Sequence, residues 1–234
     1  MNIALFGYGK MGKMIEGIAL EKGHTIVAKV EANTTIADID FSIIDVAIDF
    51  SMPNAAFKNI TTCFEHKVPV ISGTTGWLDN YDEAIKLCEE KKGAFIYASN
   101  FSLGVNIFFE LNSYLAKMMK NFNQYQVSME EIHHTQKLDA PSGTAITLAE
   151  GVINNSNYTG WKLDEAPKSE IPITAKRIGK VPGTHTVSYD YSVDSIDIKH
   201  TAHNREGFAQ GAVIAAEWIV GKTGVFHMKD VLGV

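Results

Sequence analysis

The sequence predicts an α/β fold in which a doubly wound parallel sheet carries an inserted α+β domain. Two observations lead to this prediction. Up to about Phe101, short apolar runs alternate with segments of helical period, which is the pattern of parallel strands joined by crossover helices. Beyond about Asn121, strand-like runs follow one another with little helix between them, so residues 105–204 are expected to form a separate domain.

The composition is that of an ordinary globular protein. The 234 residues are 45 % hydrophobic and 21 % charged, enough to bury a core in one or two domains. The net charge of −6 gives no support to nucleic-acid binding. No apolar run approaches the roughly 20 residues of a membrane span, and no basic leader precedes the first strand, so we expect a soluble, cytoplasmic protein. Cys63 and Cys88 form no metal or redox motif and are expected to be buried thiols.

The first element is an apolar strand, Asn2 to Phe6, and a glycine-rich turn follows it. After the turn, apolar residues recur at helical spacing. In this context a Gly-x-Gly-x-x-Gly motif indicates dinucleotide binding, because its glycines make the turn, admit the pyrophosphate and let the helix pack on the strand. The sequence therefore predicts a Rossmann-like domain. Its first cofactor-binding residues would be Gly7, Tyr8, Gly9, Lys10, Met11 and Gly12.

A second strand, Thr25 to Val30, ends at Glu31. This acid lies 19 residues beyond Gly12, where a carboxylate that binds the cofactor ribose is expected. The alternative is a solvated carboxylate at a strand end. Neither Ala32 nor Asn33 supplies a cation for a 2′-phosphate, which favours NADH over NADPH as the cofactor.

Three further strand-like runs are each followed by a turn rich in small and polar residues. The runs are Val46–Phe50, Pro69–Ile71 and Ala94–Ala98, and the turns contain Asp49–Ser51, Gly73–Thr75 and Ser99–Phe101. Ligands of such sheets bind outside the carboxyl ends of the strands, so these turns should share one edge with the glycine loop. Each turn taken alone is more readily an ordinary turn.

The middle block is expected to begin with an apolar helix, Gly104 to Asn121. Four strand-like runs follow, at Tyr125–His133, Pro172–Arg177, Gly183–Tyr191 and Ser195–Ala202. Alternation within the last run indicates a sheet with one covered face, and the other face is a candidate oligomer surface. Residues 154–169 are polar and are expected to be an irregular connection. Phe208 to Val220 is apolar nearly all round and predicts a buried helix.

The stretch from Glu131 to Ala145 combines two imidazoles, an ammonium group and a small-residue turn. If the chain is extended from Tyr125 to about Lys137, His133 and Lys137 point to one face and His134 to the other. Asp139 or Ser142 is the expected cap of the helix that follows. The free amides of a helix start, with Gly143 allowing close approach, suit a carboxylate or a phosphate. The alternative is a polar strand end with an ordinary turn and cap.

The run His-His-x-x-Lys-x-Asp-Ala-Pro-Ser-Gly-Thr resembles the signature of the 4-hydroxy-tetrahydrodipicolinate reductase (dihydrodipicolinate reductase) family, and the resemblance covers essentially the whole chain. It implies an NAD(P)H-dependent reduction of 4-hydroxy-tetrahydrodipicolinate, with loss of water, in diaminopimelate and lysine biosynthesis. It also implies that the C-terminal tail returns to the first domain, giving domains of residues 1–104 plus 205–234 and 105–204. A homotetramer and a dicarboxylate substrate are implied as well.

The resemblance also implies roles for particular residues. From the implied reaction we expect His133 to exchange protons with the substrate and Lys137 to donate a proton. Lys137 would also help residues 142–144 to hold a carboxylate, and His134 would bind the ring or orient its neighbour. The substrate-binding residues would be His134, Ser142, Gly143 and Thr144. Further cofactor-binding residues would be Gly73, Thr74, Thr75, Ala98, Ser99, Asn100, Phe101 and Arg205. The alternative for Arg205 is a surface charge at a helix start. His185 is taken as structural, and no metal is expected.

The chain departs from the family pattern between Glu31 and Asp49, where one strand or crossover helix is trimmed. Two other functions remain open. A different nicotinamide-dependent enzyme on the same plan explains the first part of the chain equally well, but does not predict the histidine and lysine signature. A non-catalytic nucleotide sensor needs the glycine loop and has no use for His133 and Lys137. A metal-dependent hydrolase is disfavoured, because adjacent histidines on a strand diverge.

Overall fold

The computed structural model describes residues 1–31 and 33–234 and divides into two compact units. The first unit contains Met1–Leu103 and Glu206–Val234, and the second contains Gly104–Arg205. These boundaries each lie one residue from those expected from the sequence. Within the described residues, no helix is both long and apolar enough to cross a membrane.

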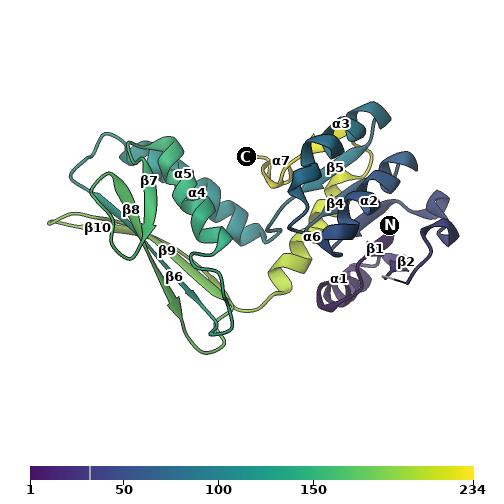
Figure 1. Cartoon of the computed structure of the whole chain (residues 1–234), viewed down its shortest axis with the longest axis horizontal. Helices are drawn as coiled ribbons and strands as arrows, with labels where there is room; N and C mark the ends of the chain where they lie inside the picture. Colours follow the sequence, from purple (N-terminus) through teal and green to yellow (C-terminus); the bar gives the residue numbers. More distant parts are fainter. Residues whose placement is uncertain (32) are drawn as a thin grey trace. The chain divides into compact units, whose positions relative to one another are not determined.

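The first unit is built on a six-stranded sheet in which every pairing is parallel, as the sequence predicts (Figure 1). The strands in spatial order are β11 (Gly224–Phe226), β5 (Ala94–Tyr97), β4 (Val70–Ser72), β3 (Val46–Asp49), β1 (Asn2–Phe6) and β2 (Thr25–Val30). The order reverses at β1, because β2 lies on one side of it and β3 on the other. Ligands of doubly wound sheets bind at such a switch point.

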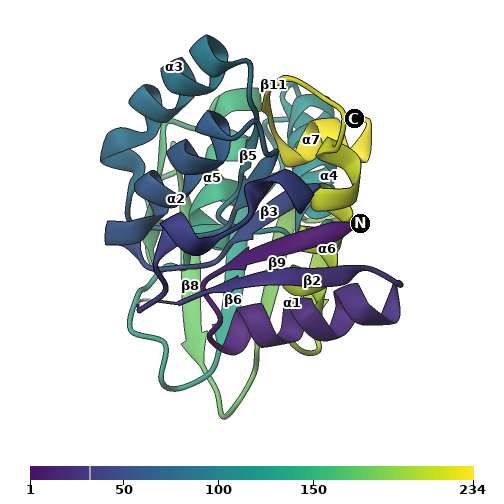
Figure 2. The same cartoon turned by 90° about the vertical axis from the view of Figure 1, so that its right-hand side faces the viewer.

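Helices cover both faces of this sheet (Figure 2). The helices α1 (Lys10–Glu21) and α6 (Glu206–Ile219) pack together on one face, and α2 (Pro53–Glu65) and α3 (Tyr81–Lys91) pack on the other. A short helix, α7 (Met228–Leu232), follows β11. Cys63 and Cys88 are buried in α2 and α3, as expected. The buried side of α6 is mostly alanine, which lets this helix approach the sheet closely.

The connection between β2 and β3 contains no α-helix among its described residues. Two short 3₁₀ turns occupy it, η1 (Ile36–Asp38) and η2 (Phe41–Ile43). Asp40 caps the second turn by accepting a hydrogen bond from the amide of Ser42 at 3.0 Å. Among its described residues the connection therefore carries 3₁₀ turns and neither a strand nor a crossover α-helix. Ala32, one of the two residues that supply no cation for a 2′-phosphate, lies outside the described residues.

The second unit contains a five-stranded mixed sheet with helices on one face. The strands in spatial order are β10 (Ser195–Ala202), β9 (Gly183–Asp190), β6 (Gln126–His133), β8 (Glu170–Arg177) and β7 (Gly160–Leu163). β9 is antiparallel to β6 and β10, whereas β8 is parallel to β6 and β7. The helices are α4 (Leu103–Met119) and α5 (Gly143–Asn155). Phe108, Leu148 and Ile173 belong to the core between helices and sheet.

One expectation for the second unit was wrong, and one condition considered for it is not met. Residues 160–163, expected to be irregular, form β7, a short and partly exposed edge strand. Pairing with β8 holds this strand in place, although its sequence shows no alternation of apolar and polar residues. The strand predicted at Tyr125–His133 ends at His133 as expected, so the condition that the chain is extended to about Lys137 is not met. β6 ends at His133, and the amide of Lys137 donates to the carbonyl of His134 at 3.1 Å, which closes a turn. His133 and Lys137 therefore do not share a strand face.

Candidate active site

The glycine loop of the first unit joins β1 to α1, and a side chain at each of its three glycines would have a different consequence. Gly7 has φ of +92°, and a Cβ there would lie 2.1 Å from the carbonyl oxygen of Phe50. A Cβ on Gly12 would lie 2.3 Å from the carbonyl oxygen of Gly7. A Cβ on Gly9 would meet nothing within 4 Å. The backbone of the turn thus requires glycine at positions 7 and 12. At position 9 glycine is not required by any neighbour, and the absence of a side chain leaves the space beside the helix start open.

The start of α1 suits a pyrophosphate. Gly9 is the N-cap residue, no side chain caps the helix, and its first turn contains no acid. The first amides and the positive end of the helix dipole therefore remain available to an anion. Tyr8 lies beside this turn, and the ammonium group of Lys29 lies 4.5 Å from its ring centroid. Lys29 itself is paired with Glu16 at 2.7 Å.

A buried carboxylate, Asp49, ties the neighbouring turns together at the carboxyl ends of β3 and β4. It accepts hydrogen bonds from three hydroxyl groups and one amide, those of Ser51 at 2.6 Å, Thr74 at 2.7 Å, Ser72 at 2.8 Å and Asn59 at 3.1 Å. Burial raises the pKa of Asp49, and these hydrogen bonds offset part of that rise. The side chain of Thr74 is therefore committed to the protein's own network.

The other predicted cofactor residues of the first unit lie at strand ends of this same sheet. Glu31 is exposed directly after β2, while the amide of Gly7 donates to the carbonyl of Val30 at 2.8 Å. Gly73 and Thr75 follow β4, and Ala98, Ser99, Asn100 and Phe101 follow β5. The side chain of Phe101 is buried against Phe50, with 5.8 Å between the ring centroids. Any contact of Phe101 with a cofactor would therefore be through its backbone.

The second unit carries the histidine and lysine signature, and its centre is the carboxylate of Glu131. This side chain is fully buried at the end of β6. It accepts from the amide of Ser142 at 3.1 Å and from the guanidinium of Arg177 at 3.0 Å. One of its oxygens lies 3.3 Å from Nδ1 of His133 and 3.7 Å from Nε2 of His185. Burial raises the pKa of Glu131, but these partners outweigh burial and hold it well below its ordinary value.

The small-residue turn forms the start of α5, as expected. Ser142 is the N-cap, and its hydroxyl oxygen accepts from the amide of Ala145 at 3.2 Å. The same hydroxyl lies 3.1 Å from Nε2 of His185. Gly143 is exposed, with open space where a Cβ would be, and Thr144 is half-buried beside it. The remaining amides of this first turn can receive a carboxylate.

Arg177 holds the loop that carries Lys137. Its guanidinium donates to the carbonyl oxygens of Asp139 at 2.6 Å and Lys137 at 3.3 Å, in addition to the carboxylate of Glu131. The ammonium group of Lys137 pairs with the carboxylate of Asp139, with N to O distances of 2.7 and 2.8 Å. His134 is half-buried at the start of this loop. Arg205 is exposed and is the last residue of the second unit.

Sequence reasoning missed Glu131 and Arg177 as parts of this cluster and assigned His185 a structural role. The alternation of β6 carries a signal for Glu131, because it occupies the same buried face as Val127, Met129 and His133. A carboxylate at an inward position needs a partner. His185 carries a similar signal, because it alternates inward with Val187 and Tyr189 on β9, but its meeting with Glu131 depends on the register in which β9 pairs with β6.

Glu131, His133 and His185 also have the geometry of potential metal ligands, with one atom from each lying within 4.8 Å of the others. The guanidinium of Arg177 already supplies positive charge to this carboxylate at 3.0 Å. A second cation beside it would be repelled. The arrangement fits a buried ion pair flanked by imidazoles better than a metal centre.

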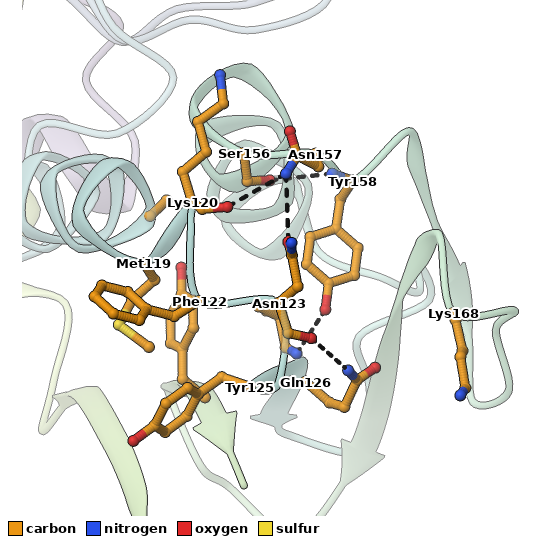
Figure 3. A pocket seen from close by; sticks show the side chains of 13 residues that line it. Met119, Lys120, Phe122, Asn123, Tyr125, Gln126, Ser156, Asn157, Tyr158 and Lys168 are labelled. Carbon is orange, nitrogen blue, oxygen red and sulfur yellow. Dashed lines mark hydrogen bonds between the residues drawn. The ribbon is translucent and has the colours of Figure 1, made fainter.

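A separate cavity of about 280 Å³ lies in the second unit, near the start of β6 and therefore far along the strand from His133 (Figure 3). Met119, Phe122 and Tyr158 are among the side chains that line it. The hydroxyl of Tyr158 accepts from the amide of Val127 at 2.9 Å. The lining includes no residue of the histidine and lysine signature, so we assign no reaction to this cavity.

The fold and the two groups of residues define a dinucleotide-dependent oxidoreductase. The first unit supplies a parallel sheet whose strand order reverses at β1, and a helix without a side-chain cap follows its glycine loop. The second unit brings together imidazoles, an ammonium group and the free amides at the start of a helix. Family models described as dihydrodipicolinate reductase, N-terminus and C-terminus, match residues 1–101 and 104–232. The chain belongs to the dihydrodipicolinate reductase family.

Individual relatives agree with this assignment. The chain is 61 % identical to the 4-hydroxy-tetrahydrodipicolinate reductase of Christiangramia forsetii over 233 residues, covering 99 % of this chain and 98 % of the relative. It is 35 % identical to that of Alkaliphilus metalliredigens, covering 100 % and 99 %. Among solved structures, a dipicolinate-bound dihydrodipicolinate reductase from Paenisporosarcina sp. TG-14 has a TM-score of 0.79 at 22 % identity, with 97 % of both chains covered. This last likeness shows the shared fold.

Proposed function

We propose that the protein catalyses the NAD(P)H-dependent reduction of 4-hydroxy-tetrahydrodipicolinate to tetrahydrodipicolinate, with loss of water, as a step of diaminopimelate and lysine biosynthesis. The observation that carries the proposal is the Glu131 cluster. One buried carboxylate joins His133, the Ser142 helix start and, through Arg177, the Lys137 loop. These are the groups that a dicarboxylate substrate with a leaving hydroxyl requires, in a chain that its family models match almost end to end.

The first requirement is an anion site. The amides at the start of α5 provide donors to one substrate carboxylate, and the Lys137 ammonium adds a positive charge nearby. Gly143 is exposed and has no side chain to obstruct this approach. The Paenisporosarcina relative binds dipicolinate, which is a planar dicarboxylate, and this supports an acidic ligand for the present chain. In this role Ser142, Gly143 and Thr144 bind the substrate, and His134 contacts its ring.

The second requirement is proton transfer. Reduction adds a hydride to the substrate ring, and the departing hydroxide needs a proton to leave as water. His133 and Lys137 are the residues that we assign to these transfers, with His133 exchanging a proton with the substrate and Lys137 acting as a donor. A positioned acid of this kind contributes about 10²- to 10⁴-fold to a rate.

The third requirement is the nicotinamide cofactor, which supplies the hydride. The uncapped start of α1 would hold its pyrophosphate, and Glu31 would bind its ribose hydroxyls. Gly73 to Thr75 and Ala98 to Phe101 would line the same edge, with Arg205 adding a charge. We favour NADH over NADPH because Glu31 would repel a 2′-phosphate and because the two residues that follow it, Ala32 and Asn33, supply no cation to bind one.

The assay that tests this function follows the loss of NADH absorbance with purified protein and freshly generated 4-hydroxy-tetrahydrodipicolinate, repeated with NADPH. We expect turnover with both cofactors and a higher kcat/KM with NADH. A Glu31→Gln variant should move that ratio toward NADPH by several-fold. If the protein binds NADH and never turns over, the reductase is wrong and the nucleotide sensor is favoured.

We also propose a cytoplasmic homotetramer. The face of the second sheet opposite α4 and α5 is polar, and Ser128 and Glu130 on β6 project from it next to Thr186 and Ser188 on β9. Two such faces can pack through paired hydroxyl and charged groups. Light scattering of the purified protein should return four times the mass of the chain. A monomer in that measurement would remove the proposal.

A further inference from the structure

Glu131 is contacted by residues from four different elements. It lies at the end of β6 two residues before His133, and it receives the amide of Ser142 from the start of α5. Arg177 reaches it from β8, and His185 from β9. The carboxylate is fully buried. A buried charge persists only where such partners compensate it, so the position of each partner depends on Glu131.

The two nitrogens of His133 have different surroundings. Nδ1 is buried and lies 3.3 Å from Oε2 of Glu131, although no hydrogen bond is aligned between them. Nε2 lies on the other side of the ring, where a Cβ added to Gly183 would be only 3.0 Å away. The ring of His185 meets that of His133 edge-on, with centroids 5.0 Å apart. The imidazole is thus confined on several sides.

This geometry decides between the two neutral tautomers of His133. An ionised carboxylate only accepts hydrogen bonds, so the nitrogen that faces it is stabilised as N–H. Nδ1 then carries the hydrogen, and Nε2 is left with a lone pair. Alignments of this kind are often loose without substrate and tighten when it binds. His133 would therefore present Nε2 to an acidic proton, and the same carboxylate would stabilise the imidazolium that follows.

We propose that Glu131 is a positioning residue for the reaction, which sets the Nδ1–H tautomer of His133 and anchors the Lys137 loop and the Ser142 helix start to the same point. This inference rests on the proposed function for its kinetic consequences. The link to Lys137 runs through Arg177, whose guanidinium joins the carboxylate to the carbonyl oxygens of Lys137 and Asp139. The proton-transfer groups and the anion site are then held at a constant separation by one side chain.

A purely structural ion pair between Glu131 and Arg177 is the competing explanation. It predicts that removing the charge lowers stability and leaves the tautomer of His133 and the ratio of kcat to KM as they were. The positioning role predicts changes in both. The two explanations therefore separate on measurements that do not depend on stability.

The chain offers a matched control in the neighbouring acid, Glu130. It lies on the same strand, but its side chain points to the open face of the sheet and pairs with Lys176. Glu131→Gln and Glu130→Gln both remove one carboxylate from β6 with the same change of atoms. Only the first should affect the cluster.

The tautomer of His133 is measured by two-bond ¹H–¹⁵N NMR of protein labelled at histidine, with His133→Gln used to assign its signals. We expect Nδ1–H in the wild type and in Glu130→Gln, and a shift toward Nε2–H in Glu131→Gln. In the kinetic arm, Glu131→Gln should lower kcat at least tenfold while the dissociation constant of NADH stays within twofold of the wild type. Glu130→Gln should match the wild type in both. Because Glu130 lies on the face proposed for assembly, light scattering of this variant first checks that its assembly state is that of the wild type.

The wild-type spectrum alone keeps the proposal open to refutation if Glu131→Gln does not fold. An Nε2–H tautomer of His133 in the wild type would overturn it, as would a folded Glu131→Gln variant with unchanged tautomer and kcat. Failure of the proposed function looks different. In that case the wild type would show no turnover, while the NMR comparison of the two glutamine variants would still report whether Glu131 orients His133.

Discussion

Each unit of the molecule buries one carboxylate at the end of a strand, and the two acids behave in opposite ways. Asp49 in the first unit and Glu131 in the second are both fully buried, and both accept several hydrogen bonds. The pKa of Asp49 is raised by burial, whereas the pKa of Glu131 is lowered despite burial. The difference lies in the chemical nature of their partners.

The partners of Asp49 are neutral. Hydroxyl and amide dipoles offset part of the cost of removing its charge from water, but none brings a compensating charge. Glu131 has the guanidinium of Arg177 and two imidazoles within reach. Asp49 therefore serves mainly to connect the turns of the proposed cofactor edge, whereas Glu131 adds a fixed negative charge beside the groups that we propose for proton exchange.

The largest expected effect is in the second unit. Lys137→Met should lower kcat about 10²- to 10⁴-fold, because it removes both a proton donor and a charge near the substrate carboxylate. The dissociation constant of NADH should remain unchanged. Lys162→Met is the control, since Lys162 is an exposed residue of β7 that pairs with Glu170 on β8. Wild-type turnover in Lys137→Met would contradict the assignment of proton transfer to the second unit.

In the first unit, substitutions at two glycines of the same loop should affect different properties, stability in one case and NADH binding in the other. Gly7→Ala should destabilise the protein by about 3 kcal/mol or more, because its Cβ would collide with the backbone of Phe50 at a positive φ. Gly9→Ala has open space around it and should retain the wild-type melting temperature. It should nevertheless weaken NADH binding at least tenfold, because a methyl group would stand where the pyrophosphate approaches. Thermal unfolding and NADH titration of both variants check this, and tight NADH binding by Gly9→Ala would contradict it.

A smaller effect is expected from Asp49→Ala. Three hydroxyl groups and the Asn59 amide would lose a buried acceptor, at a cost of about 2–3 kcal/mol after they find new partners. The affinity for NADH should fall in the same variant, because the turns after β3 and β4 would lose their common anchor. Urea unfolding and cofactor titration measure the two effects separately. Loss of stability with unchanged NADH affinity would place the cofactor away from this edge.

The smallest effect concerns the pH dependence of stability, and the two acids should contribute with opposite sign. Glu131 has a lowered pKa, so its stabilisation is present above its unfolded pKa of about 4.3 and is lost as the pH falls. Asp49 has a raised pKa, so its ionisation reduces stability as the pH rises above about 3.9. Glu131→Gln should flatten the loss of stability at acid pH, and Asp49→Asn should steepen it. The measurement is the urea midpoint of the wild type and both variants at a series of acid pH values. If the comparison is wrong, the three plots of midpoint against pH will run parallel.

The parts of the site that could be predicted are local in the sequence. The glycine loop needs only one strand, one turn and one helix start, all within the first few residues. The signature from His133 to Thr144 is likewise continuous, and its serine caps α5 as expected. By contrast, the extended pattern through Lys137 was misleading, because alternation of polar residues does not show where a strand stops pairing. The sheet ends at His133, and a turn places Lys137 beside Asp139.

By itself the sequence determined the alternating order of strands and helices and the glycine loop, and it supplied the residues that we propose for proton transfer, since each depends on neighbours a few positions away. Tertiary structure decided that β7 joins the second sheet and that Arg177 and His185 reach Glu131. These depend on which strands pair and in which register, and the free energy of pairing comes from residues far apart in the chain. The charge state of Glu131 follows from that pairing, because only the folded chain brings its donors together.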